Sequence, residues 1–375
     1  MTLFRNVDIL DGDGWRRGVD ITVDDGRIAD IRDSMAIPGA RVISPGLVDL
    51  QVNGGGGLML GDCRTPEDIG QIVLAHRRLG TTHILPTLIS DSFAATARVI
   101  ELLAKARLSV PGLSGLHLEG PHLAIPGAHD PGLLRPMNAE DLALYLKAKT
   151  RLGTLMITLA PEQVSLEQIS TLAEAGVIVA LGHGACTYDD AIAAFEAGAR
   201  MATHLFNAMS GLHHRAPGLA GAALDRAEAF GLIADGHHLH DAGLRLAARA
   251  RPDAVLLVSD AMAVAGTGAK GFALNGRQIT RKGGQLTLSD GTLAGADTSL
   301  LHCALYLAKV LDVPPVETLP YAFDAPWRLL TGSPNRIAEG DAAAFFIGDR
   351  NGLTLFDLDT LHHVALPEHI VRPDD

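Results

Sequence analysis

Short apolar runs recur through the middle of the chain, and most of them end in Gly, His, Asp or Pro. Amphipathic stretches of about 10 to 15 residues separate the runs, and this alternation is typical of parallel α/β folds. The eight runs are GLVDLQV (46–52), THILPTL (82–88), SGLHLEG (114–120), LMITLAP (155–161), VIVALGH (177–183), MATHLF (201–206), FGLIADG (230–236) and AVLLVSD (254–260). Eight such units predict a (β/α)8 TIM barrel over residues 45–335.

Helix-start signals support the barrel. PEDIGQIVLAHRRLG follows Thr65, and Thr187 opens TYDDAIAAFEAGAR. A Thr before an amphipathic stretch is a common N-cap, because its hydroxyl accepts from a free backbone N–H of the first turn. We therefore predict helices after both threonines, on the outside of the barrel.

The two ends of the chain have a different pattern. Residues 1–44 alternate β-rich pieces with DG turns, and residues 336–375 return to short β pieces. We predict that these segments pair into one small β-sandwich domain beside the barrel. NG, GG and DG turns within residues 271–295 predict a hairpin insertion after the eighth strand, followed by helix to about residue 332.

Composition and charge narrow the classes of function. The chain is 47% hydrophobic and 20% charged, which is typical of a globular protein. A net charge of −12 without a long Lys/Arg run argues against a nucleic-acid partner. No apolar stretch approaches the roughly 18 residues of a membrane span, and the first residues do not resemble a secretory leader. Cys63, Cys186 and Cys303 form no CxxC pair, so we expect a cytoplasmic protein without membrane contact.

Candidate metal ligands stand at or near the ends of three predicted strands. Glu119 belongs to the third run, His183 ends the fifth and His204 lies in the sixth. In TIM barrels the C-terminal strand ends build the active site. One carboxylate with two imidazoles is a common ligand set for catalytic zinc or a similar divalent ion. Their spacing along the chain is no local motif, so the metal prediction depends on the barrel prediction.

Asp260 ends the eighth run, where burial beside a cation would keep it ionised and aim it at a bound water. It is therefore the candidate proton carrier, and a helix cap is the alternative interpretation. Five other histidines are interpreted as packed or surface residues: His76, His302, His362, His363 and His369.

Several motifs occur together and in order: PGLVDLQVNG, HLEGPHL with AHDP after it, LGHG, ATHLFNAM, PGLAG, IADGHH and LVSDA. With them the chain resembles the N-acetylglucosamine-6-phosphate deacetylases of the amidohydrolase superfamily over nearly its whole length. HLEGP, ATHLFNAM and PGLAG in combination are specific to that family. PGLVD and the late SDA are shared across the superfamily.

The resemblance implies that Glu119, His183 and His204 bind the metal, in agreement with the strand-end argument. It implies that Asp260 acts first as general base and then as general acid, and that His129 polarises the amide carbonyl. It also implies a homodimer in which Arg215 reaches the neighbouring active site. The expected substrate contacts are Gln51, His129, Asn207, Ala208, Arg215, His238, Ala294 and Gly295.

Two departures from the wider superfamily bear on the metal. Two-metal members carry His-x-His after the first strand, whereas this chain has Gln51, Val52 and Asn53. Neutral amides are poor ligands, so we expect one divalent ion per subunit: zinc, with iron or another divalent ion as alternatives. Cys186 near His183 is either a soft ligand or a packed thiol.

The expected reaction is metal-dependent hydrolysis of the acetamide of N-acetyl-D-glucosamine 6-phosphate to D-glucosamine 6-phosphate and acetate, in amino-sugar catabolism. One alternative is a deacetylase of another N-acetylated sugar phosphate, such as N-acetylgalactosamine 6-phosphate. The other is a barrel that has lost catalysis and serves as a binding protein.

Overall fold

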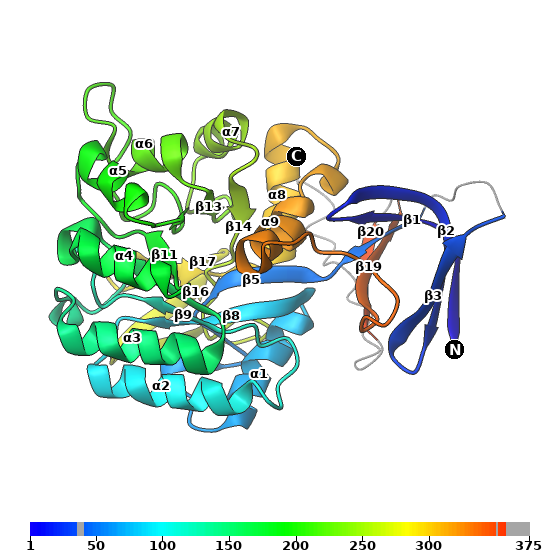
Figure 1. The fold of residues 1–375 in the computed structure, drawn as a ribbon, viewed down its shortest axis with the longest axis horizontal. Coiled ribbons are helices and arrows are strands. Elements are labelled where there is room, and N and C mark those ends of the chain that lie inside the picture. Colours follow the sequence, from blue (N-terminus) through cyan, green and yellow to red (C-terminus); the bar gives the residue numbers. More distant parts are fainter. Residues whose placement is uncertain (36–40, 350–351, 358–375) are drawn as a thin grey trace.

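The computed structural model describes residues 1–35, 41–349 and 352–357. A barrel surrounded by helices occupies one side of the molecule, and a smaller β-sheet lies beside it (Figure 1). The part of the predicted C-terminal β segment at residues 358–375 lies outside the described residues, as do His362, His363 and His369.

The barrel consists of eight parallel strands, one in each predicted run. They are β5 (Leu47–Val52), β8 (Thr81–Ile89), β9 (Leu116–Glu119), β10 (Leu155–Leu159), β11 (Ile178–Leu181), β12 (Met201–Ala202), β13 (Ala229–Leu232) and β14 (Val255–Leu257). The sheet order follows the chain order from β5 to β14. Residues just beyond β14 close the ring, because Ala261 bridges Val52 in parallel and the Asp260 N–H donates to the Gln51 carbonyl at 3.0 Å. The TIM-barrel prediction is confirmed.

Helices cover the outside of the barrel (Figure 1). They are α1 (Pro66–Arg77), α2 (Phe93–Ala106), α3 (Ala139–Leu152), α4 (Leu166–Glu174), α5 (Tyr188–Glu196), α6 (Gly218–Arg226), α7 (Asp241–Ala250), α8 (Leu300–Leu311) and α9 (Pro320–Thr331). Short 3-10 turns are η1 (Leu60–Asp62), η2 (Pro131–Leu133), η3 (Pro161–Gln163) and η4 (Pro315–Glu317). Thr65 and Thr187 cap α1 and α5 with complete capping boxes, as predicted.

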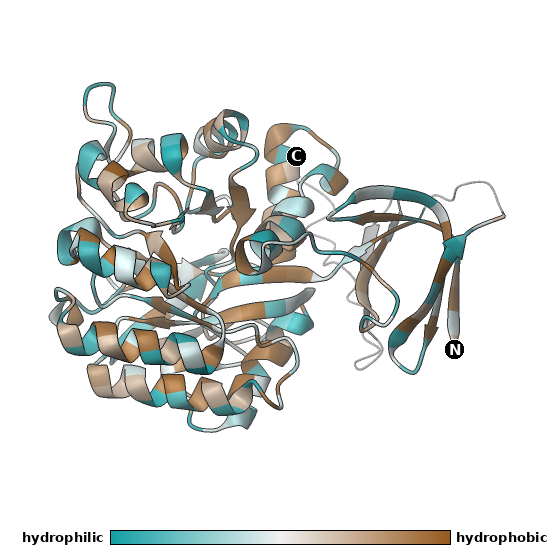
Figure 2. Cartoon of the chain, in the orientation of Figure 1, coloured by the Kyte–Doolittle hydropathy of each residue, from teal (hydrophilic) through white to brown (hydrophobic). Residues whose placement is uncertain are grey.

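The hydropathy of the helices and strands explains how the helices pack on the barrel. Each shell helix carries both hydrophobic and hydrophilic residues, while the strands inside are mostly hydrophobic (Figure 2). The strands are buried on both faces, by the barrel interior and by the helices, so they form continuous apolar runs in the sequence. None of the helices within the described ranges combines the length and the apolar character that a membrane span requires.

The two ends of the chain meet in one mixed sheet with the strand order β20-β19-β4-β1-β2-β3. Its strands are β1 (Thr2–Asp11), β2 (Gly14–Asp24), β3 (Arg27–Asp33), β4 (Val42–Pro45), β19 (Ala344–Asp349) and β20 (Gly352–Asp357). Strand β19 runs antiparallel to β4, which joins the C-terminal segment to the N-terminal one. Phe4, Ile9, Ile43 and Phe345 pack in its core. The sequence predicted a sandwich, and the described strands hydrogen-bond into a single six-stranded sheet.

Two small sheets lie over the C-terminal end of the barrel. The predicted insertion forms an antiparallel sheet of β15 (Gly271–Leu274), β16 (Arg277–Lys282), β17 (Gln285–Thr287) and β18 (Leu293–Ala296). The second is the hairpin of β6 (Gly54–Gly55) and β7 (Leu58–Met59). The N–H of Ala296 donates to the carbonyl of Asp260 at 2.9 Å, so β18 returns the insertion to the eighth strand end.

Candidate metal centre and active site

A cavity of about 270 Å³ lies at the C-terminal ends of the barrel strands. Barrel strand ends and the loops that follow them supply most of its wall, and the β15–β18 insertion supplies the rest. Its lining residues are Asn53, Ile89, Glu119, Gly127, Ala128, His129, His183, His204, Asn207, Ala208, Ile233, His238, Asp260, Met262, Leu274, Thr292, Leu293 and Gly295.

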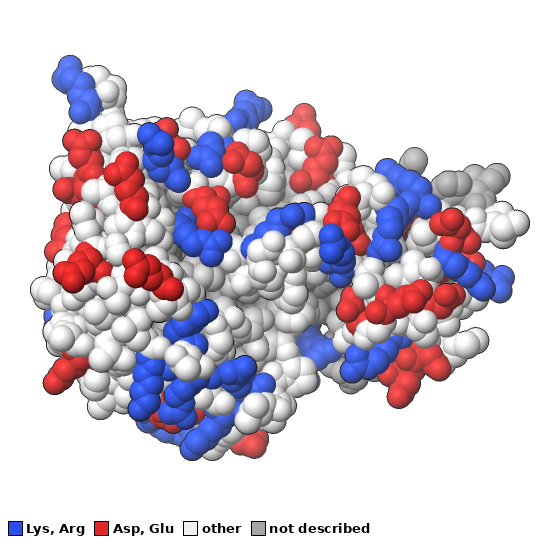
Figure 3. All heavy atoms as spheres, in the orientation of Figure 1, with Lys and Arg blue, Asp and Glu red and all other residues white. Residues whose placement is uncertain are grey.

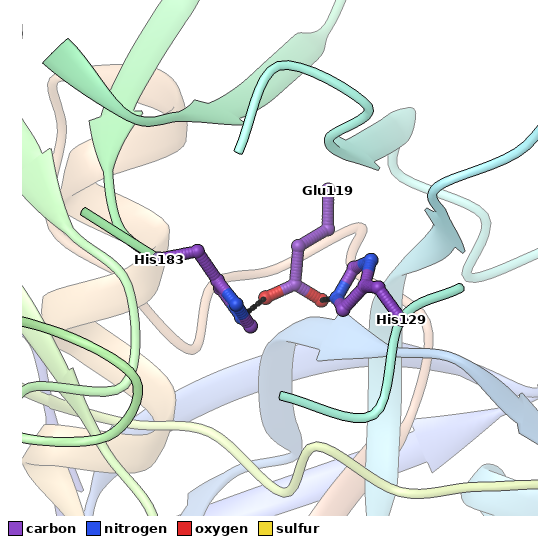
Figure 4. Close-up of side chains that lie close together, drawn as sticks. All are labelled: Glu119, His129 and His183. Atoms are coloured by element: carbon purple, nitrogen blue, oxygen red, sulfur yellow. Dashed lines mark ion pairs between the residues drawn. The ribbon is translucent and has the colours of Figure 1, made fainter. Parts of the chain in front are cut away.

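Glu119 is the centre of a cluster of buried imidazoles. Its Oε1 lies 3.0 Å from Nε2 of His204 and 3.4 Å from Nε2 of His183, and these two nitrogens are 3.1 Å apart. On the other side, Nε2 of His129 is 3.8 Å from Oε2 of Glu119. Figure 4 shows the Glu119 carboxylate between His183 and His129. Ligand atoms of Glu119, His129 and His183 all lie within 4.8 Å of one another, so the cluster could hold a metal ion.

Hydrogen bonds at the far side of each ring distinguish a metal ligand from a proton donor. Nδ1 of His183 lies 2.7 Å from the Ile125 carbonyl, which can only accept, so we assign the proton to Nδ1 and leave the Nε2 lone pair facing Glu119. In His129 the Ser90 backbone N–H donates to Nδ1 at 3.2 Å, and the Ser90 hydroxyl lies 2.8 Å away. The Nε2 of His129 therefore carries the proton and faces the cavity as a donor.

The backbone at the site adopts an uncommon conformation. His183, His204 and Asp260 have φ values of 50°, 30° and 53°, in the left-handed region that side chains other than Gly rarely occupy. Such residues cost roughly 1–3 kcal/mol each and concentrate at functional sites. The left-handed turns end the strands and aim these side chains into the cavity.

Asp260 is held by two amide side chains from the end of β5. Nδ2 of Asn53 donates to Oδ1 of Asp260 at 2.7 Å, and Nε2 of Gln51 donates to the same oxygen at 3.2 Å. Nε2 of Gln51 also donates to Oε1 of Glu119 at 3.1 Å. Among the described residues, the side-chain hydrogen bonds to the Asp260 carboxylate all reach Oδ1, so Oδ2 is the oxygen left to exchange a proton.

The electrostatics of the cavity favour a cation. Burial, with the charge of Glu119, raises the pKa of Asp260. Burial also opposes ionisation of Glu119, but the neighbouring His183 and His204 outweigh it and hold the pKa of Glu119 well below its usual range. Within the described part of the chain, no Lys or Arg lines the cavity. Two buried carboxylates without a Lys or Arg partner in the wall, beside the unprotonated Nε2 of His183, fit a divalent metal ion.

Burial, then the neighbouring His183, lowers the pKa of His129 to about 3. The ring is therefore neutral at pH 7, with its single proton on the cavity side.

Most of the residues predicted to bind substrate line the cavity. His129, Asn207, Ala208, His238 and Gly295 do so. The structure places the other three elsewhere. Gln51 is fully buried behind the two carboxylates, and Ala294 packs into a hydrophobic cluster while its neighbours Leu293 and Gly295 face the cavity. Arg215 lies in the exposed loop 211–216.

Sequence reasoning missed three features of the site. Ser90 orients His129, and a hydroxyl directly after the β8 run was its only signal. Asp235 accepts from Nδ1 of His238 at 2.7 Å and so orients that ring; IADGHH contained the pair. The insertion supplies Leu274, Thr292 and Leu293 to the wall. The thiol of Cys186 is outside the cavity lining and belongs to the hydrophobic core, which favours the packed interpretation.

The fold and this site define the chain as a (β/α)8 barrel protein with a candidate centre for a divalent metal. It is 39% identical to the N-acetylgalactosamine-6-phosphate deacetylase of Shewanella sp. (strain ANA-3), across 72% of this chain and 69% of the relative. It is 33% identical to the N-acetylglucosamine-6-phosphate deacetylase of Vibrio furnissii, across 83% and 81%. The chain belongs to the family of N-acetylglucosamine-6-phosphate and N-acetylgalactosamine-6-phosphate deacetylases.

A solved structure agrees with this assignment. The N-acetylglucosamine-6-phosphate deacetylase of Pasteurella multocida superposes with a TM-score of 0.85 at 28% identity, over 95% of this chain and 97% of that one. No protein-family model matches the sequence. Together, the relatives and the fold confirm the expected resemblance and the class of enzyme.

Proposed function

We propose that the protein hydrolyses the acetamide of N-acetyl-D-glucosamine 6-phosphate to D-glucosamine 6-phosphate and acetate, with one divalent metal ion per subunit. The observation that carries the proposal is the convergence of the Glu119 carboxylate with the Nε2 atoms of His183 and His204. The Asp260 carboxylate lies beside them and shares the Gln51 amide with Glu119. This arrangement supplies a metal ligand set and a base in one cavity.

Glu119, His183 and His204 would hold the ion. His183 fits because the Ile125 carbonyl fixes its tautomer, and His129 does not fit because its Nε2 carries the proton. Nδ1 of His204 is buried without a hydrogen-bond partner among the described residues, so no hydrogen bond at Nδ1 fixes the tautomer of this ring. As a ligand, His204 would carry its proton on Nδ1 and bind the ion through Nε2. Two imidazoles and a carboxylate suit zinc, and iron or another divalent ion is the alternative. Gln51 and Asn53 use their amide N–H groups on Asp260, and their neutral amide oxygens are poorer ligands than imidazole nitrogens, which supports a single ion.

When bound, such an ion acidifies water and polarises a carbonyl oxygen. The residues of the chain then carry the proton transfers. Oδ2 of Asp260 accepts a proton from the attacking water and returns it to the nitrogen of the departing amine. Nε2–H of His129 donates to the oxygen of the acetyl carbonyl as negative charge develops there. Asn207 and His238 bind the sugar phosphate, and Asp235 holds the His238 ring.

The phosphate requires positive charge that the cavity wall does not supply. Arg215 lies in an exposed loop before α6, and its guanidinium makes no hydrogen bond or ion pair with the described residues. On the face shown in Figure 3, basic side chains gather at the lower end of the barrel, and acidic ones are spread over the rest of that face. A homodimer in which Arg215 enters the neighbouring cavity supplies a guanidinium with the geometry that a phosphate dianion prefers.

Replacing Arg215 with Ala is expected to raise KM for the phosphorylated sugar roughly 10- to 100-fold with little change in kcat. A charge-assisted hydrogen bond contributes about 1.5–3 kcal/mol. Steady-state acetate release measures both constants. Arg226→Ala removes another exposed arginine, one that pairs with Asp225, and serves as the control. An unchanged KM in Arg215→Ala would exclude the phosphate contact.

A second candidate substrate is N-acetylgalactosamine 6-phosphate, because the Shewanella relative bears that name. The two sugars differ only in the configuration at C4. Comparing kcat/KM for both epimers and for unphosphorylated N-acetylglucosamine tests the proposal. A higher value for the gluco epimer supports it, and a higher value for the galacto epimer assigns the second candidate. Equal kcat/KM values for the phosphorylated and the unphosphorylated sugar would show that the enzyme does not recognise the phosphate.

The proposal also covers the division into domains and the cellular compartment. We assign residues 1–44 and 336–375 to the small domain and residues 45–335 to the catalytic barrel. The pairing of β4 with β19 supports this division for the described residues. Cys63, Cys186 and Cys303 are buried free thiols, which supports a reducing compartment such as the cytoplasm.

A further inference from the structure

A chain of buried polar side chains crosses the barrel interior beneath the candidate metal ligands. Nε2 of His117 lies 2.7 Å from the Thr158 hydroxyl, and that hydroxyl lies 2.6 Å from the hydroxyl of Thr203. All three side chains are fully buried. Buried polar groups inside a hydrophobic barrel are costly unless paired, so their presence in a row calls for a role.

The bonds in this chain point in one direction. Nδ1 of His117 lies 3.1 Å from the Leu50 carbonyl, which can only accept, so Nδ1 carries the proton. The Thr87 hydroxyl, 3.2 Å from the same nitrogen, donates to the Leu85 carbonyl at 3.3 Å and is a second acceptor. In the neutral ring, Nε2 accepts from the Thr158 hydroxyl. Thr158 Oγ1 in turn accepts from the Thr203 hydroxyl. These hydrogen bonds link β5, β8, β9, β10 and the residue that follows β12.

A glycine makes the last bond possible. Strand β11 lies between β10 and β12, and Gly182 directly follows it. A Cβ on Gly182 would lie 2.9 Å from Cγ2 of Thr158 and 3.1 Å from Cβ of Thr203. Any side chain at this position would push the two threonines apart. The absence of a side chain therefore lets Thr158 and Thr203 meet across β11.

The residues of this hydrogen-bond network are close in sequence to all three candidate ligands. Thr203 precedes His204, Gly182 precedes His183, and His117 lies two residues before Glu119 on β9, so the two side chains of β9 point to the same side of the sheet. None of His117, Thr158 and Thr203 lines the cavity or has a role in the proposed reaction.

We propose that Thr158, Thr203 and His117 are positioning residues, and that their hydrogen-bond chain holds Glu119, His183 and His204 in the arrangement that binds the metal. The proposal rests on the proposed function through that ligand set. Residues that orient metal ligands typically change affinity 10- to 100-fold when they are replaced. A merely structural network would change stability alone.

The test is the Kd for Zn²⁺ of the metal-stripped full chain, measured by competition with a chromophoric chelator. Thr158→Val keeps the shape and removes the hydroxyl, and it is expected to raise Kd roughly 10-fold or more. Thr158→Ser restores the hydroxyl and is expected to return Kd close to wild type. Gly182→Ala separates the threonines while keeping both hydroxyls, and the same rise is expected.

Thr318→Val is the matched control, because the Thr318 hydroxyl is equally buried and donates to the Ala304 carbonyl at 2.7 Å, within the helical shell. It is expected to lower the melting temperature of the metal-free protein and leave Kd unchanged. A wild-type Kd in Thr158→Val, or an equal rise in Thr318→Val, overturns the inference. So does a Thr158→Val chain that fails to fold while Thr318→Val folds, since the network would then serve folding. Failure of the wild type to bind Zn²⁺ would instead contradict the ligand set.

Discussion

Replacing Asp260 with Asn is expected to lower kcat for acetate release by roughly 10²- to 10⁴-fold, the usual contribution of a general acid–base group, while metal content and KM stay near wild type. The amide keeps the shape of the side chain and can still face Asn53 and Gln51. It cannot take up the proton at Oδ2 that the reaction transfers from water to the leaving amine. Steady-state kinetics with elemental analysis of the same sample measures both quantities.

Asp141→Asn is the control for this prediction, because Asp141 is also buried but pairs with Arg135 on the outer shell. That variant is expected to lose stability and to keep kcat for the folded fraction. Near-normal turnover of Asp260→Asn with metal bound would show that another group carries the proton.

Replacing His204 with Ala is expected to remove the metal, whereas replacing His129 with Ala is expected to leave the metal and lower kcat. The far-side hydrogen bonds give the reason: Ser90 fixes the proton of His129 on Nε2, where it can donate but not ligate. Losing one donor to the developing oxyanion costs roughly 10²- to 10³-fold in kcat. Losing a ligand removes the ion and with it nearly all activity.

The metal-to-protein ratio of both variants, measured by elemental analysis, separates the two possible ligand sets. His76→Ala is the control, because His76 is buried against the Gly54 carbonyl and does not line the cavity. A metal-free His129→Ala together with a metal-loaded His204→Ala would assign Glu119, His129 and His183 as the ligands.

The sequence predicted the barrel well because the physical cause of the pattern is local. A barrel strand is buried on both faces, so it reads as an apolar run, and a Thr cap depends on residues three positions apart. The ends of the runs were less accurate. The sixth run was predicted over residues 201–206, but β12 stops at Ala202, because the chain soon turns into the left-handed backbone of His204.

The candidate ligands could be predicted from strand ends, and their tautomers could not. The pairing of Ser90 with His129 spans 39 residues, and that of His183 with Ile125 spans 58. Such contacts depend on how loops fold over the barrel. Gln51 and Ala294 were predicted to contact substrate, but neither lines the cavity. The reason is a different one: neighbouring residues on a strand point to opposite sides, and the sequence does not state which side faces the cavity.

The most direct test of the central claim is acetate release from N-acetylglucosamine 6-phosphate by the metal-loaded protein, by chelator-stripped protein and by stripped protein supplied again with Zn²⁺. We expect the loaded protein to release acetate, the stripped protein to lose the activity while remaining folded by circular dichroism, and the added ion to restore it. Full acetate release by protein shown to be metal-free by elemental analysis would contradict the account.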